Sequence, residues 1–240
     1  MAGSNILVFG GTGPAGICLL RELLFRGHGV IVFARNPSKV PGDLRPNPLL
    51  EVVKGELTDR DALSTAISQS STILSLLGPN TLWYIDTTIY TNFYKSVFNL
   101  MRQHGVRRIF AMSTLSVWQP EDTFALTRWL LVTLVFFVAH FGWRTARAMA
   151  RVFEESAEGL DWTVFRIAGI PGASDEKTWK EDREDGDSFE GWIGQTGWST
   201  HQKRAALARW LVDAAEDGKT RWIGKMPAVS RFAKSGRKTA

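Results

Sequence analysis

The stretch Asn5-Ile-Leu-Val-Phe-Gly-Gly-Thr-Gly-Pro-Ala-Gly16 decides the fold. Its apolar run leads directly into closely spaced glycines, which predicts a buried strand that ends in a tight turn. Leucines then recur at helical spacing over residues 19–24, and Gly27 and Gly29 supply a helix stop. A strand, a glycine turn and a helix in this order predict the first unit of a parallel α/β sheet.

The glycines of this turn have the spacing that a bound dinucleotide requires. Gly11, Gly13 and Gly16 satisfy Gly-x-Gly-x-x-Gly, and Gly10 starts a second match, Gly-x-x-Gly-x-x-Gly. The first glycine allows the sharp turn, Gly13 lets the backbone approach a pyrophosphate, and Gly16 lets the helix pack closely on the strand. The helix N-terminus adds free N–H groups and positive charge. We therefore expect a dinucleotide to contact Gly10, Gly11, Thr12, Gly13, Pro14, Ala15 and Gly16.

The end of the second predicted strand indicates which dinucleotide is bound. An acidic residue there would bind the ribose hydroxyls of NAD, but the chain has Arg35 and, in the next loop, Lys39. Two cations suit a 2′-phosphate, so we expect NADP(H), with ordinary surface cations as the alternative interpretation. Later strands should end beside the same cofactor, which adds four expected contacts, Leu57, Leu77, Gly78 and Ser113.

Strand and helix patterns alternate along the rest of the chain. The predicted strands cover residues 5–9, 30–34, 50–54, 72–77, 108–112, 162–167 and 221–223. Predicted helices follow the glycine turn and cover about 59–68, 85–103, 123–158 and 200–215. This alternation predicts a Rossmann-type, doubly wound parallel sheet with a small C-terminal substrate region. We expect one domain over 1–230, a substrate loop or lid at about 170–200, and a disordered basic tail at 231–240.

Composition limits the classes of function. The 240 residues are 44% hydrophobic, which is enough for one large core. Cys18 is the only cysteine, so neither a disulfide framework nor a metal site is expected. The net charge of +5 comes from scattered basic residues, so nucleic acid is not an expected partner. The sequence has no secretory leader pattern before the first strand, and we expect a soluble, cytoplasmic protein that is a monomer or a homodimer.

One segment is unusually apolar. Residues 129–141 read WLLVTLVFFVAHF, with Arg128 and Arg144 on either side. Thirteen residues at ~1.5 Å rise extend roughly 20 Å, which is too short for a hydrocarbon core of ~30 Å. The segment is therefore expected to be a buried helix, a helix at a subunit contact, or a helix lying weakly on a membrane surface.

Five motifs resemble those of atypical short-chain dehydrogenase/reductases of the NmrA-like and flavin/biliverdin-reductase-like NAD(P)H-binding type. They are ILVFGGTGPAG, ARNPSK, VVKGELTDRDAL, RRIFAMSTLSV and SAEGLDWTVFRIAGIPG. The resemblance implies a sheet of order 3-2-1-4-5-6-7, NADPH along its carboxyl edge, and a substrate pocket built from the C-terminal third. The chain departs from the wider superfamily because it lacks a Tyr-x-x-x-Lys pair after the fifth strand. All three tyrosines, Tyr84, Tyr90 and Tyr94, precede that strand.

Without that pair, the candidate catalytic groups are hydroxyls and histidines. Ser113 and Thr114 follow the fifth strand, where a hydroxyl can orient a substrate carbonyl, although loop capping explains them equally well. His140 and His201 are candidate proton donors because histidine titrates near neutral pH. The leading hypothesis is an NADPH-dependent reductase of a small apolar, conjugated or aromatic substrate. The alternatives are a non-catalytic NADP(H)-sensing regulator and a non-redox isomerase, cyclase or dehydratase on the same fold.

Overall fold

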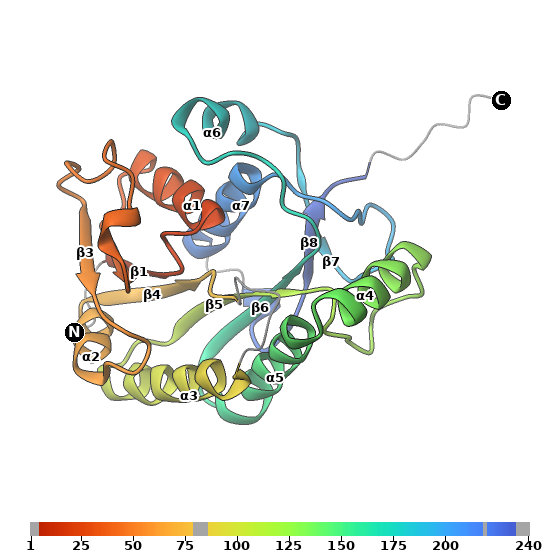
Figure 1. The fold of residues 1–240 in the computed structure, drawn as a ribbon, viewed down its shortest axis with the longest axis horizontal. Helices are drawn as coiled ribbons and strands as arrows, with labels where there is room; N and C mark the ends of the chain where they lie inside the picture. Colours follow the sequence, from red (N-terminus) through yellow and green to blue (C-terminus); the bar gives the residue numbers. More distant parts are fainter. Residues whose placement is uncertain (1–4, 79–85, 218–219, 234–240) are drawn as a thin grey trace.

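The computed structural model describes residues 5–78, 86–217 and 220–233. Within them, eight strands form one sheet in the order β3-β2-β1-β4-β5-β6-β8-β7 (Figure 1). All neighbours pair in parallel except β7 and β8, which are antiparallel. The strands are β1 (Asn5–Phe9), β2 (Val30–Ala34), β3 (Leu50–Lys54), β4 (Ser70–Ser75), β5 (Arg108–Thr114), β6 (Asp161–Ile167), β7 (Ser188–Gly191) and β8 (Ala228–Arg231).

Helices cover both faces of this sheet. Figure 1 shows α1, α6 and α7 on one face and α2, α3 and α5 on the other, while α4 projects at the side. Each face has its own apolar core, and the buried strand residues alternate between the two cores. The helices are α1 (Pro14–Phe25), α2 (Arg60–Ser68), α3 (Thr87–His104), α4 (Leu126–Val138), α5 (His140–Ser156), α6 (Glu176–Asp182) and α7 (Arg204–Glu216).

The predicted doubly wound sheet is confirmed, but its C-terminal edge differs from the expected one. The first six positions follow the order 3-2-1-4-5-6, and β8 takes the seventh. The strand predicted at 221–223 is wrong, because Thr220–Trp222 forms a 3₁₀ turn (η2). Gly224 follows with a φ of 70°, a left-handed conformation that does not continue a β-strand. The edge of the sheet is instead the antiparallel pair β7 and β8, and β8 continues through Arg231, the first residue of the expected tail.

The stretch at 170–200 is more ordered than its irregular sequence pattern predicts. It contains α6 and β7, and Trp179 of α6 is 4% exposed. The Trp179 ring lies edge-on to Phe25 at the end of α1, with ring centroids 5.6 Å apart. Trp179 is therefore an anchor between helices on the face of α1, α6 and α7, and not part of a lid.

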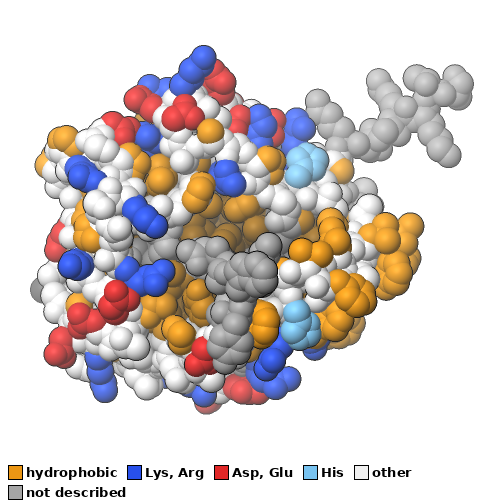
Figure 2. All heavy atoms as spheres, viewed as in Figure 1, with side chains coloured by type: hydrophobic (Ala, Val, Ile, Leu, Met, Phe, Trp, Pro, Cys, Tyr) orange, Lys and Arg blue, Asp and Glu red, His pale blue; other side chains and the backbone are white. Residues whose placement is uncertain are grey.

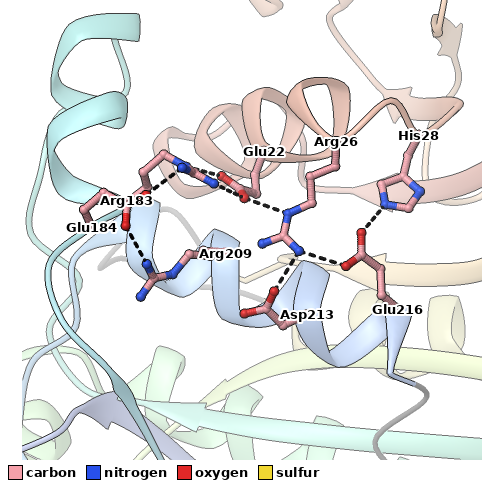
Figure 3. Close-up of polar contacts among 8 residues, drawn as sticks. All are labelled: Glu22, Arg26, His28, Arg183, Glu184, Arg209, Asp213 and Glu216. Carbon is pink, nitrogen blue, oxygen red and sulfur yellow. Dashed lines mark hydrogen bonds and ion pairs between the residues drawn. The ribbon is translucent and has the colours of Figure 1, made fainter.

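A polar network joins the helices on that same face (Figure 3). Glu22 of α1 is fully buried and accepts hydrogen bonds from Arg26 and Arg183, at 2.9 and 3.0 Å. Arg26 also forms an ion pair with Glu216 of α7 at 2.8 Å, and the Glu216 carboxylate lies 2.7 Å from the His28 ring nitrogen Nε2. Because a buried carboxylate is costly without partners, this network fixes α6 and α7 against α1.

The apolar helical region at 123–158 is divided into two helices. It breaks at Ala139, and α4 and α5 meet there with a bend of 113°. None of the α4 residues is buried, so the expectation of a buried core helix is wrong. Among the described residues, no single helix is long and apolar enough to cross a membrane; α4 and α5 reach that criterion only as this bent pair.

Candidate functional site

Two glycines of the β1–α1 turn are required by the fold itself. Gly10 has φ of 76°, and a Cβ there would lie 2.8 Å from the carbonyl of Leu76, which follows β4. A Cβ on Gly16 would lie 2.1 Å from the Gly10 oxygen, so no side chain fits. These contacts hold the start of α1 tightly against the sheet, as the glycine spacing predicts.

Gly13 is different, because the chain itself does not require a glycine there. Its φ of −81° suits any residue, and a Cβ would meet only the Gly10 oxygen at 3.6 Å. Gly13 is also the N-cap of α1, where no side chain caps the helix. The first N–H groups of α1 and the surface above Gly13 therefore remain available to a ligand, and an anion is the ligand that a helix N-terminus favours. This turn fits the pyrophosphate of a dinucleotide.

The two cations expected to bind a ligand, Arg35 and Lys39, follow β2 and are not used by the described part of the fold. Arg35 and Lys39 are both exposed, and neither forms a hydrogen bond or ion pair with a described residue. The loop that carries Lys39 is held by Arg45, whose guanidinium donates to the carbonyls of Ser38 and Val40 at 2.5 and 2.9 Å. Sequence reasoning missed Arg45 because its role is a pair of backbone contacts within an irregular loop.

The loops after β3 and β4 continue the same edge of the sheet. Leu57 packs in part against the core, and Gly78 accepts a hydrogen bond from the Tyr90 hydroxyl at 3.4 Å. Burial raises the pKa of Tyr90, and the nearby Arg35 cation opposes that rise.

A mostly apolar cavity of about 420 Å³, here called the β5 pocket, lies beside this edge. Strand ends form its floor, through Leu77 and Gly78 after β4 and Ser113 and Thr114 of β5. Helices α4 and α5 form its walls. Its lining is Leu77, Gly78, Met112, Ser113, Thr114, Leu115, Ser116, Leu131, Val132, Val135, Gly142, Ala146, Met149, Ile167, Ala168 and Gly169. The volume and apolar character are typical of a small-molecule site at the carboxyl ends of parallel strands.

The two hydroxyls predicted at the end of β5 have different environments. The Thr114 hydroxyl accepts the Ser116 amide at 3.3 Å, which is the loop-capping role. Ser113 is 5% exposed, and its Oγ is buried without a hydrogen-bond partner among the described residues. A buried, unpaired hydroxyl is costly, so its retention in the pocket wall points to a ligand that pairs with it. Ser113 is the better candidate to contact a substrate.

The described pocket lining contains no tyrosine, histidine, lysine or carboxylate. On α5, Gly142 and Ala146 stand four residues apart and face the pocket, so this face offers space and no proton donor. Tyr94 is fully buried elsewhere, with its hydroxyl 2.7 Å from the Ser75 hydroxyl, and burial raises its pKa. The third tyrosine, Tyr84, lies outside the described residues.

Neither candidate histidine lines the β5 pocket. His140 starts α5 and stacks on Trp143, with ring centroids 5.6 Å apart. His201 is exposed, and its backbone carbonyl accepts the amide of Arg231 in β8. The structure thus gathers the cofactor candidates and Ser113 but not the histidines.

Behind the pocket, a buried ion pair fixes the loop that follows β5. Arg166 of β6 is fully buried and contacts both carboxylate oxygens of Asp122 at 2.6 and 2.8 Å. Arg166 also donates to the Val117 carbonyl at 3.0 Å, and Asp122 accepts the Ile193 amide at 3.1 Å. This cluster sets the path of the loop from β5 to α4, and therefore the shape of the pocket. Sequence patterns did not indicate it, because the partners are 44 residues apart.

Glycine turn, strand edge and adjoining apolar pocket together define a dinucleotide-binding α/β protein of the Rossmann type. The chain matches the NAD(P)H-binding family model over residues 10–218, and it belongs to that family. The absence of a Tyr-x-x-x-Lys pair is consistent with the atypical short-chain dehydrogenase/reductase type that the motifs resemble.

Curated proteins with similar sequences match part of the chain. A 3-beta-hydroxysteroid dehydrogenase of Mycolicibacterium neoaurum is 31% identical over 188 residues, which are 74% of this chain and 50% of the relative. The chain spans between 18% and 50% of the length of the curated relatives it matches.

Solved structures resemble the chain along nearly its whole length. A short-chain dehydrogenase/reductase of Veillonella parvula DSM 2008 in complex with NADP has a TM-score of 0.72 at 16% identity, covering 95% of this chain and 94% of that one. An anaerobillin reductase of Escherichia coli O157:H7 has a TM-score of 0.66 at 15% identity, covering 98% of this chain and 100% of that one. At these identities the likeness establishes the fold.

Proposed function

We propose that the protein is an NADPH-dependent reductase of a small, planar and largely apolar substrate that carries a carbonyl or conjugated system. The observation that carries this proposal is the β5 pocket, a cavity of about 420 Å³ at the carboxyl ends of β4 and β5, with a buried hydroxyl that has no partner among the described residues. A bound nicotinamide would supply hydride. The protein itself would contribute by holding the substrate in a fixed position next to the nicotinamide, because its pocket has apolar walls and few polar groups.

Ser113 would orient the substrate. Its Oγ can donate a hydrogen bond to a substrate oxygen, and this contact would strengthen as negative charge develops on that oxygen. The apolar side chains of Val132 and Val135 on α4 and Met149 on α5 would exclude water from the same space. The proton would come from water at the pocket mouth, since none of the described lining residues is a titratable acid or base.

The preference for NADPH over NADH would come from Arg35 and Lys39. Both are exposed and lack partners in the described part of the chain, so binding a 2′-phosphate would break no existing contact there. The expected cofactor contacts at Gly10 to Gly16, Leu57, Leu77, Gly78 and Ser113 complete the proposed site. Support for the substrate class comes from the apolar lining of the β5 pocket. Of the similar proteins, one is named as a 3-beta-hydroxysteroid dehydrogenase and one as an anaerobillin reductase.

Turnover assays with a substrate panel test the proposal. The full chain would be mixed with NADPH and, in turn, a quinone, an enone, a free flavin and a ketosteroid, and NADPH loss would be followed by absorbance. We expect turnover with at least one of them, and we expect Ser113→Ala to lower kcat by about 10², as for removal of one oxyanion donor. Ser71→Ala is the matched control, because its hydroxyl lies at the opposite end of the sheet, bonded to Asn5.

The absence of any titratable group in the described pocket lining favours a second candidate, a non-catalytic NADP(H) sensor. Such a protein would bind NADPH with similar affinity but would consume it with no substrate of the panel. A third function on the same fold, that of a non-redox isomerase, cyclase or dehydratase, would convert substrate without net loss of NADPH. Product analysis beside the absorbance trace therefore separates all three functions.

A further inference from the structure

Helix α4 presents an apolar surface that the rest of the described chain does not cover. Figure 2 shows hydrophobic side chains gathered over this helix, at the side of the molecule where it projects. Phe137 is 77% exposed, and Phe124, just before the helix, is 82% exposed. The α4 surface, as we define it, consists of Phe124, Leu126, Trp129, Leu130, Leu134, Phe136, Phe137 and Val138. So many large apolar side chains on one short helix indicate a surface that is covered in use.

The charge pattern around this surface is mainly basic. Residues 123–153 contain four arginines and no acidic residue, while Glu121 and Asp122 precede this span and Glu154 and Glu155 follow it. Glu155 pairs with Arg151 at 3.9 Å. Arg128 is turned inward, where its guanidinium donates to the Leu115 carbonyl at 3.2 Å. The other three, Arg144, Arg147 and Arg151, line a depression of about 450 Å³ along α5.

This basic depression adjoins the α4 surface directly. Trp118 and Trp143 line both the depression and a groove of about 490 Å³ that runs along α4. The Arg147 guanidinium lies 4.6 Å from the Trp143 ring centroid, so the cation is held beside the apolar surface. Glu154 closes the far end of the depression. Apolar side chains, tryptophans and cations thus follow one another across a single continuous area.

The partner that matches this order is the surface of an anionic bilayer. Its acyl region accepts apolar side chains, its interface accepts tryptophan, and its phosphates pair with arginine. A second copy of the chain fits less well. A two-fold contact through α4 would bring two sets of arginines together. Of the acids that flank residues 123–153, Asp122 is already paired with Arg166 and Glu155 with Arg151.

We propose that α4 lies flat in the interface of an anionic membrane, with Arg144, Arg147 and Arg151 on the lipid phosphates. The helix rests on the surface and does not span it. Leu131, Val132 and Val135 of the same helix form a wall of the β5 pocket, so the pocket would lie beside the acyl region. A lipophilic substrate would then enter the β5 pocket from the bilayer. This consequence rests on the proposed reductase function, whereas membrane binding does not.

Flotation with lipid vesicles tests the membrane contact without any turnover. The full chain would be mixed with vesicles of pure phosphatidylcholine or of phosphatidylcholine with phosphatidylglycerol. We expect it to float with the anionic vesicles and to be released by high salt. Arg144→Gln with Arg147→Gln should weaken binding about 25-fold, at about fivefold for each cation near the surface.

The apolar contribution is tested by Leu134→Ser with Phe137→Ser, which should abolish flotation. The matched control is Leu49→Ser, an exposed leucine beside β3 at the opposite edge of the sheet. Thermal unfolding confirms that each variant is folded. Failure of the wild-type chain to float with anionic vesicles overturns the proposal, as does equal flotation of wild type and the α4 variant. A dimer in sedimentation that becomes monomeric in that variant, with no vesicle binding, would overturn it as well and would identify a second copy as the occupant.

Discussion

Replacing Arg35 with alanine should change the cofactor preference of the protein. Arg35 follows the last residue of β2, exposed and without a partner among the described residues, so its removal breaks no contact that the structure shows within the fold. The unfolding free energy should therefore stay within about 0.5 kcal/mol of wild type, as for an ordinary surface substitution. Any effect on cofactor binding then reports an interaction with the cofactor.

The expected magnitude follows from the type of hydrogen bond that the substitution removes. A hydrogen bond to a charged group contributes about 1.5–3 kcal/mol, and the exposure of Arg35 favours the lower end of that range. We expect NADPH affinity to fall about tenfold or somewhat more. NADH lacks the 2′-phosphate, so its affinity should hardly change.

Isothermal titration of wild type and Arg35→Ala with both nucleotides measures the four affinities. Arg107→Ala serves as a matched control, because it removes an exposed arginine whose partner is Asp161 at the amino end of β6. Equal losses for NADPH and NADH would refute phosphate recognition by Arg35. So would unchanged affinity for both.

Two further predictions concern the fold around the site. Asp122→Ala should cost about 3–5 kcal/mol in urea unfolding, because it leaves the buried Arg166 unpaired, while Arg107→Ala, at a solvent-exposed ion pair, should have little effect; similar losses would contradict the assigned role. Burial raises the pKa of Cys18 from 9.0 to about 11, so at pH 8 the folded chain should react with iodoacetamide about a hundredfold more slowly than the unfolded chain. The folded thiol keeps its proton longer than the unfolded one, so this group's contribution to stability is complete below pH 9.0 and is lost as pH rises toward about 11. Rapid labelling of the folded chain at pH 8 would show that Cys18 is not buried.

The sheet was predictable because its signals are local. Apolar runs alternate with helical patterns along the chain, and in α2 the helix start is also fixed locally, because the Asp59 side chain accepts the Ala62 amide. The C-terminal edge was not predictable in the same way. The run Arg221-Trp222-Ile223 has strand-like composition, but tertiary packing buries Trp222 within a 3₁₀ turn.

The glycine turn of the candidate site was predictable, and the walls of the β5 pocket were not. Glycine spacing identifies a turn whatever follows it, whereas the pocket walls depend on how α4 and α5 meet. A substrate loop or lid was expected at about 170–200, where Trp179 packs on α1; Leu131, Val132 and Val135 of α4, which the sequence did not single out as pocket residues, line the β5 pocket. The small pair Gly142 and Ala146, four residues apart, was the available signal for the α5 wall.

The central claim is that backbone groups around Gly13 bind the diphosphate of NADPH, and Gly13→Ala tests it most directly. An added methyl group meets only the Gly10 oxygen at 3.6 Å, and the backbone conformation suits alanine, so the melting temperature should stay the same or rise slightly. Calorimetry should then show one NADPH site per wild-type chain, in about the 1 μM–1 mM range, and clearly weaker binding to the variant. Equal NADPH affinity in the two proteins, or no heat of binding to wild type at millimolar nucleotide, would contradict the claim.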